Sequence, residues 1–122
     1  MADKPKDIWP TEIKLVAGKR ALAIAFDTGE SFTLPAELLR VSSPSAEVQG
    51  HSPDQRVTVA GKRNVAISDV RAIGNYAVQI VFDDGHDTGF FRWPYLHELG
   101  RRETDIWLAY LNDLAAKGLT RG

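Results

Sequence analysis

The chain has no cysteine among its 122 residues. Without thiolates it cannot form a disulfide, a cysteine-bound zinc site or a cysteine-ligated iron–sulfur cluster. Any bound metal would therefore need histidine or carboxylate ligands. The longest apolar run, Ala21 to Phe26, is far shorter than the ~20 residues of a transmembrane helix, and the first ten residues lack the apolar stretch of a signal peptide. These absences predict a cytoplasmic protein that does not enter the membrane.

Neither sign of charge predominates, because 15 Lys and Arg residues stand against 16 Asp and Glu residues. A basic stripe that would neutralise a phosphate backbone is missing, so nucleic acid is not an expected partner. The hydrophobic fraction of 43% and the charged fraction of 25% are typical of a globular protein. The length predicts one domain, over residues 12–118, preceded by a flexible N-terminal lead over residues 1–11.

Familiar catalytic motifs are also missing. His97 and Glu98 begin an H-E-x-x-H pattern, but Arg101 stands where the second histidine belongs, so His97 is expected on a helix surface. The Gly61-Lys62 pair lacks both the first glycine and the final serine or threonine of a phosphate loop. G-x-S-x-G and G-x-G-x-x-G do not occur. We therefore expect a protein that is not an enzyme.

The chain does contain an imperfect internal repeat. At an offset of 56 residues, the segment 22–29 matches the segment 78–85 in its apolar, aspartate and glycine positions: Leu22, Ile24, Phe26, Asp27 and Gly29 fall on Val78, Ile80, Phe82, Asp83 and Gly85. Both copies continue into a short apolar strand, a proline and a turn of helix that carries leucine. The repeat predicts an α+β fold, an antiparallel β-sheet made of two hairpin-plus-helix units.

A C-terminal helix from Thr104 to Gly118 is expected to cover this sheet with one apolar stripe, formed by Trp107, Tyr110, Leu111, Leu114 and Ala115. In the strand before residue 92, Phe90 and Phe91 cannot both face inward, because side chains alternate along a strand. One of these two rings is expected to contribute to an apolar patch, either exposed or covered by a helix, that is a possible partner site.

The two copies differ at the hairpin tip. The second tip carries Asp84 and His86, where an imidazole among carboxylates can bind a divalent metal. The other interpretation is that these residues only build the turn. The long polar stretch 41–64 has two interpretations: a surface loop held by its own hydrogen bonds, or a binding loop formed by Ser43, Ser45, Glu47 and His51. If His51 came close, an iron or zinc site could use His86, His51 and carboxylates such as Asp84 or Glu47.

Three segments together resemble the gamma-butyrobetaine hydroxylase-like N-terminal domain family: LRVSSPSAEVQGH (39–51), IGNYAVQIVFDDGHDTGFF (73–91) and WPYLHELG (93–100). The resemblance extends over residues 13–114. It implies a zinc site of three cysteines and one histidine, of which His86 alone is retained, since Ser43, Ser45 and Val48 stand at the cysteine positions. The oxygenase domain of the hydroxylases is not part of this chain, so hydroxylase activity is not expected.

Relatives of this domain are fused to Mrp-type P-loop ATPases that carry iron–sulfur clusters. The resemblance therefore implies a non-catalytic binding or adaptor domain, accessory to iron or iron–sulfur cluster handling, with such an ATPase as a possible protein partner. The alternative is an intrinsic iron- or zinc-binding protein that uses His86 with His51 and nearby carboxylates.

Overall fold

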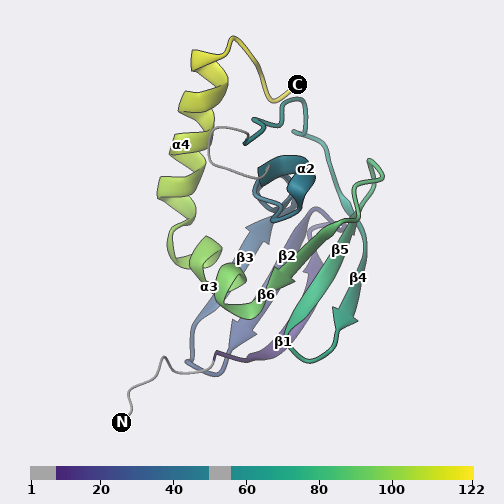
Figure 1. The fold of residues 1–122 in the computed structure, drawn as a ribbon. Coiled ribbons are helices and arrows are strands. Elements are labelled where there is room, and N and C mark those ends of the chain that lie inside the picture. The colour runs from purple at the N-terminus through teal and green to yellow at the C-terminus, as the bar shows by residue number, and fades with distance from the viewer. Residues whose placement is uncertain (1–7, 50–55) are drawn as a thin grey trace.

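The computed structural model describes residues 8–49 and 56–122, except for the side chains of Ala46 and Glu47. Six strands and four helices follow one another in this part of the chain (Figure 1): β1 (Pro10–Val16), β2 (Ala21–Phe26), β3 (Ser31–Pro35), α1 (Ala36–Val41), α2 (Ala46–Gln49), β4 (Ile67–Ile73), β5 (Ala77–Phe82), β6 (Gly89–Arg92), α3 (Trp93–Arg101) and α4 (Glu103–Ala116).

The strands form two antiparallel sheets of three, with the orders β1-β2-β3 and β4-β5-β6. The predicted α+β class is confirmed, and each hairpin-plus-helix unit has its own sheet. A backbone hydrogen bond from Ile67 N–H to the Lys19 carbonyl (2.8 Å) connects the two sheets. Both central strands, β2 and β5, have the same order of buried and half-buried residues. Their buried side chains enter one core that both units share.

The two units have matching backbone hydrogen bonds at their hairpin tips. Phe26 N–H donates to the Glu30 carbonyl (2.8 Å), and Phe82 N–H donates to the His86 carbonyl (2.9 Å). Glu30 and His86 therefore occupy equivalent positions. Beyond them the second unit has one extra residue, Asp87, because Ala21 pairs with Pro35 in one sheet and Ala77 pairs with Arg92 in the other. Equivalent residues from there on are 57 apart.

The shared aspartates have a shared structural role. Asp27 Oδ1 accepts a hydrogen bond from Trp9 N–H (3.4 Å), and Asp83 Oδ1 accepts one from Ala66 N–H (3.1 Å). Each carboxylate thereby ties the chain that enters β1 or β4 to the tip of the following hairpin. Strand β1 begins at Pro10, inside the segment predicted as a flexible lead. Residues 1–7 lie outside the described part of the chain.

Two further expectations are corrected. The polar stretch 41–64 contains the short helix α2, and its Val48 is buried. On α4 the predicted stripe is only partly used: Tyr110 and Leu114 are buried, but Ala115 is exposed. These two buried residues pack against Val41, Val59 and Ala60, and α4 stands along one side of the molecule (Figure 1). None of the described helices has the length and apolarity needed to cross a bilayer.

Candidate functional site

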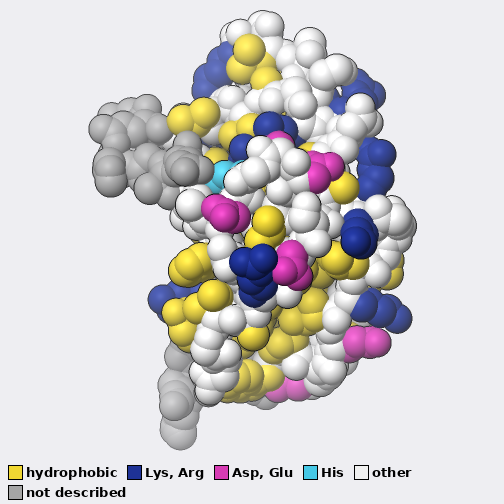
Figure 2. All heavy atoms as spheres, turned by 90° about the vertical axis from the view of Figure 1, so that its right-hand side faces the viewer, with side chains coloured by type: hydrophobic (Ala, Val, Ile, Leu, Met, Phe, Trp, Pro, Cys, Tyr) yellow, Lys and Arg dark blue, Asp and Glu magenta, His cyan; other side chains and the backbone are white. Residues whose placement is uncertain are grey.

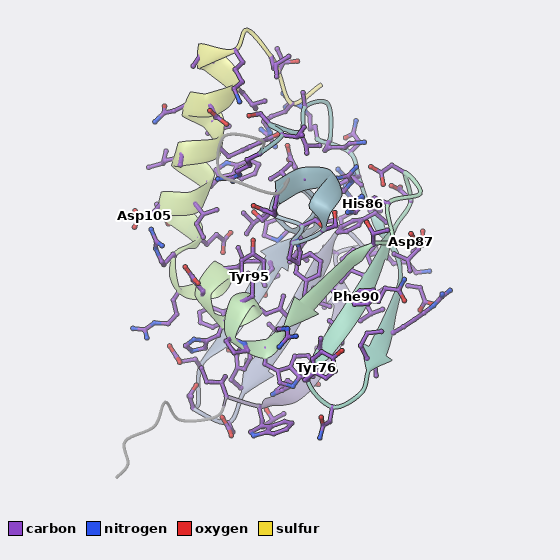
Figure 3. All side chains as sticks on the ribbon, in the orientation of Figure 1. Tyr76, His86, Asp87, Phe90, Tyr95 and Asp105 are labelled. Atoms are coloured by element: carbon purple, nitrogen blue, oxygen red, sulfur yellow. The ribbon has the colours of Figure 1, made fainter. Side chains whose placement is uncertain are left out.

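The tip of the β5–β6 hairpin lies against the end of α1 and the start of the following loop. Figure 3 labels His86 and Asp87 at this end of the hairpin. We call the group of polar residues here the tip cluster, which consists of Arg40, Ser43, Ser45, Lys62, Asp84 and His86. The bonds that join Asp84 and His86 to Arg40, Ser43, Ser45 and Lys62 connect residues 22 to 44 apart in the sequence. The fold, and not local sequence, therefore assembles the cluster.

Asp84 uses both of its carboxylate oxygens inside the protein. Oδ1 accepts the His86 N–H (3.1 Å), while Oδ2 accepts Arg40 Nε–H (2.8 Å) and Lys62 Nζ–H (2.6 Å). Burial alone would raise the pKa of Asp84. The hydrogen bonds from Lys62, His86 and Arg40 outweigh it and lower the pKa from 3.8 to about 2. Asp84 is therefore an ionised anchor for two cations, and these bonds occupy the oxygens that a metal would need.

His86 is buried, with 7% of its surface exposed. Its Nε2 lies 2.9 Å from Ser43 Oγ and 3.4 Å from Ser45 Oγ. The Ser45 N–H also donates to Ser43 Oγ (3.4 Å). Gly89 makes this approach possible, because a Cβ at that position would lie 2.4 Å from Ser43 Oγ. The serine pair and the imidazole form a hydrogen-bonded contact between the two units.

A serine hydroxyl next to an imidazole is also the arrangement of an activated nucleophile and its base. Ser43 has no exposed surface, however, so a substrate carbonyl could not approach its Oγ in this conformation. The contact between Ser43 and His86 therefore fits a structural role.

The described members of the cluster do not fit the zinc site that the resemblance implies. The cysteine positions hold Ser43 and Ser45, which offer neutral hydroxyls, and Val48, which offers no ligand atom. Structural zinc takes thiolate, imidazole or carboxylate ligands. Within residues 8–49 and 56–122, apart from the two side chains of α2 left undescribed, we find no group of three or more His, Asp or Glu side chains placed to hold a metal.

The other predicted site residues have different outcomes. Asp84 and His86, predicted as metal ligands, and Ser43 and Ser45, predicted in the binding loop, lie in one hydrogen-bonded cluster. His51 and the side chain of Glu47 lie outside the described part of the structure. The metal site that would use them stays a prediction.

The sequence interpretation missed an equivalent contact in the first unit. His97 was expected on a helix surface, but it is buried on α3, where its Nε2 lies 2.6 Å from Glu30 Oε1. Its ring packs edge-on against Phe26 and Phe32, with centroid distances of 5.1 and 5.9 Å. The hydrogen bond from His97 is the main reason that the pKa of Glu30 is lowered. The repeat offered the missing signal, because Glu30 aligns with His86.

A groove of about 410 Å³ lies between α4 and the segment 56–59. Arg102 and Arg56 line it together with Asp105 and Asp113, so its charges are mixed. The hydroxyl of Thr58 donates to Asp113 Oδ2 (2.6 Å) across it. Among the described residues that line it, no histidine could complete a metal or catalytic set with these carboxylates.

Known proteins resemble this chain over most of its length. Residues 13–97 match the family model described as gamma-butyrobetaine hydroxylase-like, N-terminal. Two solution NMR structures of proteins are each 46% identical to it. One has a TM-score of 0.82, with 99% of this chain and 90% of the other covered, and one has a TM-score of 0.79, with 93% and 89% covered.

A crystal structure from Acidithiobacillus ferrooxidans is 36% identical, with a TM-score of 0.62 over 75% of this chain and 91% of the other. It is described as a protein of unknown function of the DUF971 family. No curated protein matches the chain. Since the family model covers more than half of the residues and contains the tip cluster's Arg40, Ser43 and His86, the chain belongs to the gamma-butyrobetaine hydroxylase-like N-terminal domain family.

Proposed function

We propose that this protein is a non-catalytic, cytoplasmic adaptor domain that binds another protein and is accessory to iron or iron–sulfur cluster handling. One observation carries the adaptor part of the proposal. The polar groups that could do chemistry bond to one another inside the fold: His86 with Ser43, and Asp84 with Arg40 and Lys62. Large apolar side chains, in contrast, stay exposed on the second unit, where Phe90 and Tyr76 are 48% and 44% exposed.

The iron–sulfur part rests on the family resemblance and its Mrp-type ATPase fusions. The test is direct binding between the purified full chain and the Mrp-type ATPase of the same organism, measured by calorimetry with the ATPase in cluster-loaded and cluster-free forms. We expect a complex with a micromolar or lower Kd. If neither form binds, and affinity purification from the host recovers no iron–sulfur assembly protein, the proposed role is wrong.

The alternative, an intrinsic metal-binding protein, keeps one supporting observation. The buried His86 lies beside the loop that leads through Ser45 into α2. Glu47 belongs to α2 and precedes His51 by four residues in the sequence. Elemental analysis of protein purified without an affinity tag separates the two functions. Stoichiometric iron or zinc that is lost in His86→Ala favours the alternative, and metal-free protein with the same fold excludes it.

A further inference from the structure

The outer face of the second sheet carries an exposed aromatic pair beside a cation. Phe90 lies on β6 and is 48% exposed, whereas its neighbour Phe91 is completely buried. Tyr76 belongs to the β4–β5 turn and is 44% exposed. Arg92 connects them, because it shares the outward face of β6 with Phe90 and its guanidinium lies over the Tyr76 ring at 5.0 Å. We call these three residues the aromatic patch, and Figure 3 labels its two rings.

The scaffold does not require a phenylalanine at this position. The pairing of Ala21 with Pro35 and of Ala77 with Arg92 makes Thr33 of β3 the structural equivalent of Phe90. Thr33 is likewise exposed, and it builds the same antiparallel strand with a small polar side chain. The exposed Phe90 thus adds apolar surface, although the strand can form without a phenylalanine at this position. Figure 2 shows hydrophobic side chains between charged ones on the face turned toward the viewer.

The charges around the patch indicate what would cover it. The nearby Arg71 is already paired with Asp69, at 2.8 Å. Arg92, in contrast, makes no ion pair with any carboxylate of the described residues. Its guanidinium stacks on the Tyr76 ring. Stacking on an aromatic face holds a guanidinium in place and leaves its N–H groups free for a planar acceptor. A carboxylate is the complementary group.

Two hydrogen bonds from side chains to backbone carbonyls hold the strands and the turn of the patch in position. Trp93 Nε1–H donates to the Asn75 carbonyl (2.9 Å), which fastens the β4–β5 turn to the start of α3. Gln79, the residue paired with Phe90, donates to the Asp87 carbonyl (2.7 Å) and so ties β5 to the hairpin tip. A rigid surface loses little conformational freedom when a partner binds. Tyrosine and arginine are also the residue types that contribute most at protein interfaces.

We propose that the aromatic patch is the docking surface for the partner protein, and that it takes a segment with an aliphatic side chain next to an aspartate or glutamate. The aliphatic group packs against Phe90 and Tyr76, and the carboxylate pairs with Arg92. This proposal rests on the proposed adaptor function and specifies the surface that the function uses.

The test uses the purified full chain with the Mrp-type ATPase as the probe. Phe90→Thr installs the residue that the first unit has at the same place, and Arg92→Glu reverses the charge that meets the partner. We expect each to raise Kd at least tenfold, with unchanged thermal melts. Thr33→Ala is the matched control on the first sheet and should leave Kd within twofold. Raising the salt concentration should weaken the wild-type complex and leave Arg92→Glu less affected.

A second arm identifies the contacting segment. A benzophenone amino acid placed at position 90 or, as the control, at position 33 is photoactivated in the complex. We expect crosslinking from position 90 alone, to a peptide that contains Asp or Glu beside Leu, Ile or Val. If both patch variants bind as tightly as the wild type, or if position 33 crosslinks as strongly as position 90, the proposed surface is wrong. The adaptor function would still stand. Crosslinking to a second copy of the chain, or to a basic segment, rejects the proposed occupant. If the wild type does not bind the ATPase, it is the proposed partner that fails.

Discussion

The two hairpin-plus-helix units have one backbone plan but different polar residues. Both tips bend at a glycine with φ 91°, Gly29 in the first unit and Gly85 in the second. At the next position stand Glu30 and His86. Each of these side chains reaches across to the other unit: Glu30 contacts His97 of α3, and His86 contacts Ser43 after α1. Shared residues thus build each unit and the common core, and these unshared residues add polar contacts between the two units.

The two units touch closely at two places, which we call the crossing points. The crossing points differ in which element of the second unit carries the glycine. In one crossing the small residue is on the helix, where Gly100 of α3 faces the Phe32 ring of β3. In the other it is on the strand, where Gly89 of β6 faces Ser43. Gly89 and Phe32 are equivalent positions, as are Ser43 and Gly100. The second crossing leaves room for a polar contact, and that is where the tip cluster lies. Each crossing thus contains a glycine, which lets the two units pack closely while their polar contacts differ.

The largest expected effect tests the shared core. Phe26→Ala and Phe82→Ala should each lower the free energy of unfolding by about 3–5 kcal/mol, the range for a buried phenylalanine, since both rings are nearly inaccessible. Urea denaturation monitored by circular dichroism measures it. If one variant lost less than about half as much free energy of unfolding as the other, the two units would not be equivalent in packing.

The crossing points are tested by adding one methyl group. A Cβ at residue 100 would lie 2.4 Å from the Phe32 ring, so Gly100→Ala should destabilise the protein by about 1–3 kcal/mol, as overpacking does. The double variant Phe32→Leu with Gly100→Ala should recover part of this loss, because a smaller side chain then faces the added methyl. Equilibrium unfolding of Gly100→Ala, Phe32→Leu and the double variant gives the coupling energy between the two positions. Additive losses would contradict the contact.

The histidines are expected to stabilise the fold less than the phenylalanines do. If His86 were exposed, His86→Ala would change the free energy of unfolding by less than about 1 kcal/mol. Because His86 is buried against two serine hydroxyls, we now expect His86→Ala to cost about 1–3 kcal/mol by leaving buried polar groups without partners. His97→Ala, the comparison in the first crossing, should fall in the same range. A loss equal to that of Phe82→Ala would place His86 among the core residues.

Acid should weaken the link made by Asp84. Its folded pKa of about 2 is below the ordinary 3.8, so its ionisation stabilises the folded state above pH 4 to 5 and this contribution disappears as the pH falls toward 2. Asp84→Asn should therefore melt below the wild type at pH 7 and approach it near pH 2. Thermal melts across this range provide the measurement. A melting-temperature difference that does not change with pH would show that the charge of Asp84 adds nothing.

The smallest effect concerns the exposed faces of the two sheets. Phe90→Thr and Thr33→Phe exchange the equivalent residues, and each should change stability by less than about 0.5 kcal/mol, as surface substitutions do. The same melts measure both. A marked destabilisation by Phe90→Thr would mean that the ring belongs to the core and that its exposure is not available to a partner.

Local patterns determined much of this protein from the sequence alone. The repeat offset, the two Asp-x-Gly turns and the alternation of apolar residues predicted both hairpins, because strand alternation and turn chemistry depend on neighbouring residues. Alternation also predicted that Phe90 and Phe91 would not both face inward, and the structure exposes Phe90. The three motif segments identified the family.

Tertiary structure decided the rest. The bond between Ser43 and His86 joins residues 43 apart, and that between Glu30 and His97 joins residues 67 apart. Local spacing does not encode such pairs, since they form only when the two units pack together around one core. For the same reason the sequence placed His97 on a surface. The division of six strands into two sheets likewise depends on how long-range contacts compete, which no single segment determines.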